Sequence, residues 1–277
     1  MKIVIIGCGR FGSTITDLML EQGHDVVVVD SNDTKVEKIN NTRDVLVKCG
    51  NGADFNLLDE IGMKDTDVFI ACTASDEINM LASFLAKAMG AKHTITRALT
   101  HIPGSKATKF VQEQFKLDLF ITPDYLTAKD AYKILDANHV KSVLILGATR
   151  VGTHLTRILM EKGVDVTIVD RDSLRCDNLD MAIDGSPVII NNDESNHQIL
   201  FNAGLKETDA VISATPMDEE NILISLFAAD CNVPLIITKI ENSSYTSIVK
   251  DLTLEHVIAP RISTANIVLD YVRSLEK

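Results

Sequence analysis

A glycine loop and the aspartate that follows it are the residues of this sequence best suited to bind a nucleotide. The loop reads Gly7-Cys8-Gly9-Arg10-Phe11-Gly12, and Asp30 ends the next apolar run. A G-x-G-x-x-G loop between a strand and a helix allows a tight turn and lets the backbone approach a pyrophosphate. The helix then offers free N–H groups and its positive dipole end to the phosphates. Asp30 can accept hydrogen bonds from both ribose hydroxyls of an adenosine, and its charge repels a 2′-phosphate.

A second copy of this arrangement lies about 140 positions further along the chain. Its loop reads Gly147-Ala148-Thr149-Arg150-Val151-Gly152, and Asp170 follows it at the same spacing. Thr149 replaces the middle glycine, so a side chain projects where phosphates would pass. The small segment Cys49–Gly52 also becomes the bulkier, acidic Asn191–Glu194. We therefore expect the second site to be weakened or purely structural, with these candidate nucleotide-binding residues: Gly147, Arg150, Gly152 and Asp170.

The other candidate ligand contacts follow the ends of further predicted strands, where loops line the crevice of a doubly wound sheet. In the first half they are Ser31, Gly50, Asn51, Thr73, Ala74 and Arg97. Arg97 could face a phosphate or a subunit partner, and a surface ion pair explains it equally well. Because no arginine follows Asp30 to pair with a 2′-phosphate, we expect the pocket to favour NAD(H) or plain adenine nucleotides over NADP(H).

The elements that must position these loops also occur twice. Residues 67–80 (DVFIACTASDEINM) match residues 209–222 (DAVISATPMDEENI). A repeat of about 140 residues is too long for a solenoid unit and suits a domain. We therefore expect a dinucleotide-binding domain with its closing helix over residues 1–138, and a second such domain with a degenerate glycine loop over residues 139–277.

Apolar, β-branched runs alternate with helical patterns in both halves, and a run such as 26–29 is apolar at every position. That pattern is typical of parallel strands buried on both faces. We predict an α/β protein of two tandem Rossmann-like, doubly wound parallel sheets. The predicted strands are 2–6, 25–29, 45–48, 67–71, 93–97, 118–121, 141–146, 165–169, 187–190, 209–213, 234–238 and 255–259. The predicted helices are 11–22, 33–40, 54–60, 76–89, 105–114, 124–136, 151–162, 195–202, 218–230, 243–250 and 262–275, with 172–183 helical by analogy.

The composition argues against several classes of function. The 277 residues carry a net charge of −12, which disfavours a nucleic-acid binder because phosphate binding needs clustered Lys and Arg. No stretch approaches the ~20 apolar residues of a membrane-spanning helix. The N-terminus runs straight into a predicted strand, unlike a signal peptide. The five cysteines show no zinc spacing and suggest a reducing compartment, so we expect a cytoplasmic protein.

No catalytic constellation is visible in the sequence. There is no HExxH, GxSxG or P-loop lysine, and Tyr125 and Lys129, at the spacing of a short-chain dehydrogenase pair, lack the upstream serine. Both halves consist of Rossmann-like sheets, which leaves no second set of residues to polarise a substrate against a nicotinamide. We therefore expect no enzymatic activity. An NAD-dependent oxidoreductase and a ligand-free assembly scaffold are the alternatives.

The segments IVIIGCGRFG, CGNGAD, ACTASDEINM and ITPDYLTA, in this order, resemble the N-terminal lobes of RCK/KTN domains. The resemblance covers nearly the whole chain, once per half. It implies a cytosolic regulatory subunit of bacterial potassium uptake whose lobes bind NAD(H) or ATP/ADP and thereby gate a membrane potassium transporter or channel. It also implies that the loop glycines and Arg10 contact the phosphates and that Asp30 holds the ribose.

The resemblance extends to assembly. The closing helices 124–136 and 262–275 resemble the crossover helices that pair lobes, so we expect a homo-oligomer, a dimer of tandem chains, that docks at the inner face of the plasma membrane. Family members carry a small C-terminal lobe after each N-terminal lobe, and both small lobes are expected to be missing here. The choice between NAD(H) and ATP/ADP stays open, because Asp30 would grip the adenosine ribose of either.

Overall fold

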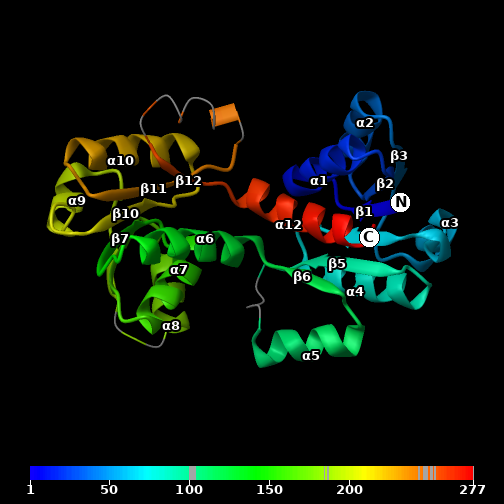
Figure 1. Cartoon of the computed structure of the whole chain (residues 1–277), viewed down its shortest axis with the longest axis horizontal. Helices are drawn as coiled ribbons and strands as arrows, with labels where there is room; N and C mark the ends of the chain where they lie inside the picture. The colour runs from blue at the N-terminus through cyan, green and yellow to red at the C-terminus, as the bar shows by residue number, and fades with distance from the viewer. Residues whose placement is uncertain are drawn as a thin grey trace. The chain divides into compact units, whose positions relative to one another are not determined.

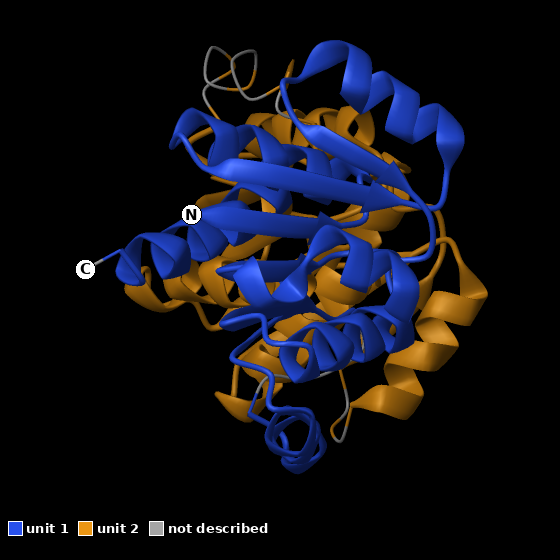
Figure 2. Cartoon of the chain, turned by 90° about the vertical axis from the view of Figure 1, so that its right-hand side faces the viewer, with its two compact units in different colours: residues 1–123, 261–277 blue, residues 124–260 orange. Residues whose placement is uncertain are grey.

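A computed structural model of the chain describes all residues except 100–103, 184, 186, 243, 246–248, 250, 251, 253 and 277. The chain forms two compact units, one of residues 1–123 with 261–277 and one of residues 124–260 (Figure 2). In each unit, helices flank a six-stranded parallel sheet (Figure 1). The predicted fold class, two tandem Rossmann-like doubly wound sheets, is confirmed.

The sheet of the first unit has the strand order β3-β2-β1-β4-β5-β6, so the order reverses between β1 and β4. All of its neighbouring strands are parallel. Its strands are β1 (Lys2–Ile6), β2 (Asp25–Asp30), β3 (Leu46–Cys49), β4 (Val68–Ala71), β5 (His93–Arg97) and β6 (Leu119–Ile121). Its helices are α1 (Arg10–Glu21), α2 (Asp33–Thr42), α3 (Phe55–Ile61), the 3₁₀ turn η1 (Met63–Asp65), α4 (Asp76–Ala88), α5 (Lys106–Phe115) and α12 (Pro260–Ser274).

The second sheet repeats this arrangement with the order β12-β11-β10-β7-β8-β9. Its strands are β7 (Ser142–Leu146), β8 (Asp165–Asp170), β9 (Val188–Asn191), β10 (Ala210–Ser213), β11 (Leu235–Lys239) and β12 (His256–Ile258). Its helices are α6 (Pro123–Ala137), α7 (Arg150–Glu161), α8 (Ser173–Ala182), α9 (His197–Asn202) and α10 (Asp218–Asp230). The weakly patterned stretch 172–183 therefore does form a helix, α8. The helix predicted over 243–250 falls mostly outside the described residues.

The central strand β1 shows why these strands are apolar at every position. Ile3 and Ile5 belong to one buried cluster, shared with α1 and α12, whereas Val4 and Ile6 belong to another, shared with α3 and α4. All four side chains are buried. Since helices cover both faces of the sheet, none of these four positions faces water.

Each unit contains the closing helix that the other half of the sequence supplies. Helix α12 belongs to the first unit, where Val268 and Val272 share a buried cluster with Ile15 of α1. Helix α6 belongs to the second unit, where Leu135 shares a buried cluster with Leu155 of α7. The compact units therefore differ from the expected domain ranges, 1–138 and 139–277, by an exchange of these two helices.

We expect Leu135→Ala to loosen the second unit and to leave the first unit intact, although residue 135 precedes the second repeat. The side chain is buried in the second unit, and removing such a leucine costs about 2–5 kcal/mol. Hydrogen exchange should reveal lost protection in β7 and β8, with Lys129→Ala on the same helix as the exposed control. Lost protection confined to β1 and β2 would contradict the helix exchange.

A carboxylate fastens the start of the first strand in each unit. Asp67 Oδ2 accepts a hydrogen bond from the backbone N–H of Lys2 at 2.8 Å. Asp209 Oδ2 accepts from the backbone N–H groups of Lys141 and Ser142, both at 2.9 Å. These two hydrogen bonds hold the pKa of Asp209 below its ordinary value, and the one from Lys141 has the larger effect. Each aspartate directly precedes the fourth strand of its unit, so it joins the fourth strand to the first.

The free energy of unfolding should therefore decrease in acid, in part because Asp209 becomes protonated and loses these hydrogen bonds. A lowered folded-state pKa means that its hydrogen bonds contribute fully above the ordinary value of 3.8 and are lost as the pH falls through the folded-state pKa. We expect Asp209→Ala to reduce stability near neutral pH by about 1 kcal/mol, and to make the melting temperature less sensitive to acid. Thermal melts across the acid range check this, with the exposed Asp165→Ala as control. An unchanged acid sensitivity would refute it.

Candidate functional site

The loops that follow the first five strands of the first unit meet at the carboxyl edge of its sheet. Gly7 N–H donates to the carbonyl of Val29 at 2.7 Å, and Gly50 N–H donates to the carbonyl of Asp30 at 3.0 Å. This edge includes the switch point between β1 and β4, where doubly wound sheets bind ligands. The first-unit candidates lie on these loops, at strand ends or in the first turn of α1: Gly7, Gly9, Arg10, Phe11, Gly12, Asp30, Ser31, Gly50, Asn51, Thr73, Ala74 and Arg97.

The three loop glycines have different surroundings. Gly7 has a φ of +98°, and a Cβ there would lie 2.9 Å from the backbone nitrogen of Thr73. A Cβ on Gly12 would lie 1.9 Å from the carbonyl oxygen of Gly7, so α1 could not pack on the loop. A Cβ on Gly9, by contrast, would meet nothing within 4 Å. Gly7 therefore suits the tight turn, Gly12 allows α1 to pack on the loop, and Gly9 borders open space.

The start of α1 leaves its first N–H groups without a capping side chain. Gly9 is the N-cap residue, and the first turn carries no acidic side chain. The neighbouring helices α2 and α4 are instead capped by the side chains of Asn32 and Ser75. Uncapped N–H groups at a helix start, together with the helix dipole, form an anion-binding site. The start of α1 is therefore suited to a phosphate group.

Asp30 connects the second strand to the glycine loop and remains accessible. Its Oδ2 accepts from the N–H of Cys8 at 2.8 Å, and its Oδ1 accepts from the N–H of Asn32 at 2.9 Å. Burial alone would raise the pKa of Asp30, but the two N–H groups, the Cys8 thiol and Lys35 together outweigh burial and hold the pKa below its ordinary value. The side chain is 11% exposed, and Lys35 Nζ, 4.0 Å away, is on a half-exposed side chain. Each ionised oxygen therefore keeps a lone pair for a ribose hydroxyl.

Arg97 reaches this edge from the end of β5 with an unsatisfied donor. Its guanidinium carbon lies 5.3 Å from the centre of the Phe11 ring. Its Nε is buried and has no hydrogen-bond partner among the described residues. Leaving a buried donor unpaired costs about 1–3 kcal/mol, and a phosphate oxygen is a strong acceptor for a guanidinium. Of the three interpretations left open for Arg97, namely a phosphate contact, a subunit contact and a surface ion pair, this environment favours the phosphate contact.

Asn79, which the sequence analysis did not single out, shapes the loop after β4. Its Oδ1 accepts from the backbone N–H of Thr73 at 2.8 Å and from the Thr73 hydroxyl at 2.7 Å. Its Nδ2 donates to the carbonyls of Thr73 and Arg97 at 3.2 and 3.0 Å. Asn221 makes the equivalent backbone contacts in the second unit. The signal was present, because both copies of the D-E-x-N segment keep this asparagine.

The loop after β3 packs closely against Ile6 in the first unit. A Cβ on Gly52 would lie 1.9 Å from Cγ2 of Ile6, so only glycine fits this position without displacement. Several candidate contacts around the crevice are exposed to solvent: Arg10, Ser31, Asn51 and Ala74. This side of the crevice is therefore bordered by small or solvent-facing groups.

The second unit has the same framework but fills it with its own side chains. Ala148 N–H donates to Asp170 Oδ2 at 2.7 Å, as Cys8 N–H does to Asp30. Asp170, however, is fully buried. Arg175 grips its carboxylate with two parallel hydrogen bonds, Nε to Oδ2 at 2.8 Å and Nη2 to Oδ1 at 2.7 Å.

Arg171 and Glu194 fill the neighbouring space of the second unit. Glu194 Oε2 accepts from the backbone N–H of Arg171 at 2.9 Å and from its Nε at 3.1 Å. The same guanidinium pairs with Asp193 at 3.0 Å and with Glu220. Glu194 is 1% exposed, and burial raises its pKa against the opposing effect of Arg171. These groups form one continuous ion-pair network.

Thr149 stands where Gly9 stands in the first unit. It is the N-cap residue of α7, and its hydroxyl donates to the carbonyl of Ala214 at 2.9 Å. Since a Cβ on Gly9 would enter open space, the threonine side chain occupies the equivalent space in the second unit. Of the other candidates, Gly147 has a φ of +112° and Arg150 is exposed. A Cβ on Gly152 would lie 2.2 Å from the carbonyl oxygen of Gly147, so it is the counterpart of Gly12.

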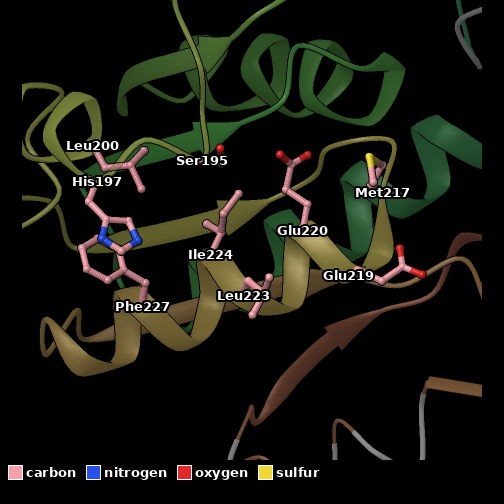
Figure 3. Close-up of a pocket in the computed structure, with 9 residues that line it drawn as sticks. All are labelled: Ser195, His197, Leu200, Met217, Glu219, Glu220, Leu223, Ile224 and Phe227. Carbon is pink, nitrogen blue, oxygen red and sulfur yellow. The ribbon is translucent and has the colours of Figure 1, made fainter.

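A cavity of about 520 Å³ lies between α9 and α10 of the second unit (Figure 3). Its lining residues are mostly apolar: Ser195, His197, Leu200, Met217, Glu219, Glu220, Leu223, Ile224 and Phe227. Both acids are already paired, Glu219 with the hydroxyl of Tyr245 at 2.6 Å and Glu220 with Arg171. The carboxylates of Glu219 and Glu220 at the edge of this cavity disfavour a phosphate.

The described residues provide no metal centre. No three of their His, Cys, Asp and Glu side chains are grouped to hold a metal ion. Burial, and then the adjacent Asp30, raise the pKa of Cys8 to about 12, so its thiol stays protonated at neutral pH. Tyr125 of the dehydrogenase-like pair packs edge-on against the ring of His154, with ring centres 5.7 Å apart. Among the helices that the structure describes, none has the length and apolar character needed to cross a bilayer.

A model of the TrkA-N domain family matches the chain twice, over residues 3–110 and 143–260. A Trk system potassium uptake protein TrkA homolog from Archaeoglobus fulgidus is 24% identical, with 99% of this chain and 82% of the relative aligned. TrkA of Halomonas elongata is 21% identical, with 99% and 79% aligned. The Archaeoglobus alignment extends over 359 positions, more than the 277 residues of this chain, so that relative carries internal segments that this chain lacks.

Solved structures of GsuK share the fold. GsuK bound to ADP superposes with a TM-score of 0.80 at 17% identity, covering 96% of this chain and 68% of GsuK. The GsuK channel bound to NAD superposes with a TM-score of 0.82 at 13% identity, covering 99% and 64%. At these identities the likeness establishes the shared architecture of the two tandem sheets.

The different environments of Asp30 and Asp170 predict that removing their basic partners changes stability by different amounts. Arg175→Ala leaves the buried Asp170 without its charged partner, which we expect to reduce stability by about 3 kcal/mol. Lys35→Ala, at the equivalent position of the first unit, removes a half-exposed side chain and should change stability by about 0.5 kcal/mol or less. Urea unfolding of both nucleotide-free variants checks this. Equal losses would show that Arg175 does not support a buried carboxylate.

Proposed function

The chain belongs to the TrkA-N domain family, and on that basis we propose that it is a nucleotide-sensing regulatory subunit of potassium transport. In this proposal an adenine nucleotide, NAD(H) or ATP/ADP, binds in the crevice of the first unit and controls a potassium transporter or channel in the membrane. The protein acts in the cytoplasm, docks on its membrane partner at the inner face of the plasma membrane, and assembles as a dimer of tandem chains. Its relatives are named potassium uptake proteins.

The observation that carries the proposal is the set of unsatisfied groups at one edge of the first unit. The start of α1 is uncapped, the space beside Gly9 is open and the buried Nε of Arg97 has no partner among the described residues. Asp30 stands ionised at the end of β2. These are the donors that a diphosphate requires and the acceptor that a ribose requires. We assign the phosphates to the Gly7–Gly12 loop, Arg10 and Arg97, and the ribose to Asp30.

The same groups determine which nucleotides are accepted. The charge of Asp30 repels a 2′-phosphate, the exposed Ser31 beside it carries no charge, and the nearby Lys35 is paired with Asp30 itself. We therefore propose that NADPH binds far more weakly than NADH. Adenosine diphosphate, free or as part of NAD, presents the ribose and the phosphates that these residues recognise. One GsuK structure contains ADP and another contains NAD.

Regulation in this proposal requires no chemical step on the ligand. Two nucleotide states shift the protein between arrangements only through their different affinities for each arrangement. A coupling of about 1–3 kcal/mol between the nucleotide site and the membrane partner would change transport activity by roughly 5- to 150-fold. We expect no turnover of the nucleotide, which separates this proposal from an NAD-dependent oxidoreductase. Binding itself separates it from a ligand-free scaffold.

Isothermal titration of the full chain with NADH, NAD, NADPH, ATP and ADP tests the proposal. We expect Asp30→Ala to lower affinity for the bound nucleotides by about 100-fold, because two hydrogen bonds to a charged acceptor are lost. The matched control is Asp25→Ala, which removes the same charge at the exposed opposite end of β2 and should bind as the wild type. If the wild type binds none of the five nucleotides, nucleotide sensing is refuted.

Potassium uptake then tests the regulatory step. Rubidium uptake by cells that carry only Asp30→Ala should lose its normal regulation, while cells with Asp25→Ala should behave as the wild type. Normal uptake by a variant that binds no nucleotide would separate transport from nucleotide sensing and contradict the proposal.

A further inference from the structure

Besides Thr149, three charged positions distinguish the second crevice from the first. Strand pairing places Asp30 beside Cys49 and Asp170 beside Asn191, so the loops that follow can be compared residue by residue. By this register Arg171 replaces Ser31, Arg175 replaces Lys35 and Glu194 replaces Gly52. All three replacements carry charge and form ion pairs: Arg171 pairs with Glu194 and Glu220, whereas Arg175 pairs with Asp170.

We propose that the second unit contains a latent adenine-nucleotide site that its own Arg175 and Arg171 occupy in place of the ligand. This inference rests on the proposed nucleotide binding of the first unit. Its consequence is that the chain senses nucleotide at one unit, while the other is held permanently in a ligand-independent form.

Arg175 makes the contacts that a ribose would make. A ribose offers two hydroxyl donors to the carboxylate at the end of the second strand, and Arg175 offers Nε and Nη2 at 2.8 and 2.7 Å. The guanidinium is charged, planar and matched to a carboxylate, so its two hydrogen bonds are stronger than those of neutral hydroxyls. Asp170 has no exposed surface left. A nucleotide could reach this carboxylate only by displacing Arg175.

Glu194 and Arg171 close the adjacent space. At the equivalent position of the first unit even a Cβ would lie 1.9 Å from Ile6, whereas the second unit buries an entire glutamate there. Glu194 is held by the backbone N–H and the Nε of Arg171. Arg171 in turn reaches Asp193 and Glu220, so three carboxylates surround the guanidinium. Their combined charge also opposes the approach of a phosphate.

The test opens the second crevice while the first is disabled. In an Asp30→Ala background, the set R171S, R175K and E194G converts the three positions to their first-unit counterparts, and T149G clears the glycine loop. We expect titration with ADP and NADH to give about one site per chain, with affinity at least 10-fold above that of the background. T149G alone in the same background should bind neither nucleotide. Binding by T149G alone would show that threonine, and not the arginines, closes the site.

The variant with all four second-unit substitutions is tested alongside a reciprocal change in the first unit, which keeps the inference testable even when that variant does not fold. Ser31→Arg with Lys35→Arg places two arginines on exposed positions beside Asp30. We expect this pair to lower the affinity for ADP at least 10-fold without reducing the melting temperature. The comparison variant Ser31→Lys adds the same charge without a guanidinium; if it loses as much ADP affinity as the arginine pair, the loss comes from Ser31 or from the charge, and self-occupation by arginine is contradicted.

The possible results separate this inference from the proposed function. Suppose that the wild type binds one ADP, that the opened second unit gains no ADP binding, and that the arginine pair leaves ADP affinity unchanged. Self-occupation is then wrong, while nucleotide sensing by the first unit is supported. If the wild type binds none and the opened second unit binds one, self-occupation stands while sensing by the first unit is wrong.

Discussion

In both units one carboxylate joins the end of the second strand to the glycine loop, and the crevice depends on that connection. Asp30 accepts the N–H of Cys8, and Asp170 accepts the N–H of Ala148, at nearly the same distance. A buried backbone N–H needs an acceptor, and an ionised carboxylate near an apolar core needs donors, so each group satisfies the other. This connection sets the loop beside the sheet and orients the remaining lone pairs of the acid toward the crevice.

The two units differ in how those remaining lone pairs are satisfied. Asp30 keeps some exposure, so water or a ligand can complete its hydrogen bonds. Asp170 has none, so the protein itself must supply the donor, and Arg175 does so with a geometry that few other side chains can match. The burial of Asp170 and its pairing with Arg175 therefore depend on each other. The same framework becomes a structural ion-pair site once the donor comes from the chain.

The sequence predicted the repeated framework well because the framework depends on local patterns. Continuous apolar runs, loop glycines and their spacing to Asp30 and Asp170 are visible without a structure, and the strands and most helices lie where they were expected. The weak pattern of α8 was also resolved correctly by comparison with the first half. Contacts between residues far apart in the chain could not be predicted from the sequence. The pairing of Arg171 with Glu194, 23 positions apart, depends on the register of β8 with β9, which no local pattern specifies.

The exchange of closing helices was also beyond the sequence. The apolar positions of α6 and α12 predict that each helix covers a core, but the two cores are alike, and the helices are alike as well. Nothing in the residue pattern says which core each helix completes. Similarly, the orphaned Nε of Arg97 and the central role of Asn79 follow from three-dimensional packing, although the repeated asparagine was a usable clue.

The exchanged helices have a consequence for how such a chain could arise. A single-repeat protein with this topology would leave its own core uncovered and would complete it only with the closing helix of a second copy, which is reciprocal domain swapping. Its folding would then depend on concentration, because the core forms only on association. Fusing two repeats into one polypeptide makes the exchange intramolecular and replaces that dependence with a fixed effective concentration. Fusion also frees the two copies to diverge, so one crevice can remain open while the other acquires charged residues of its own.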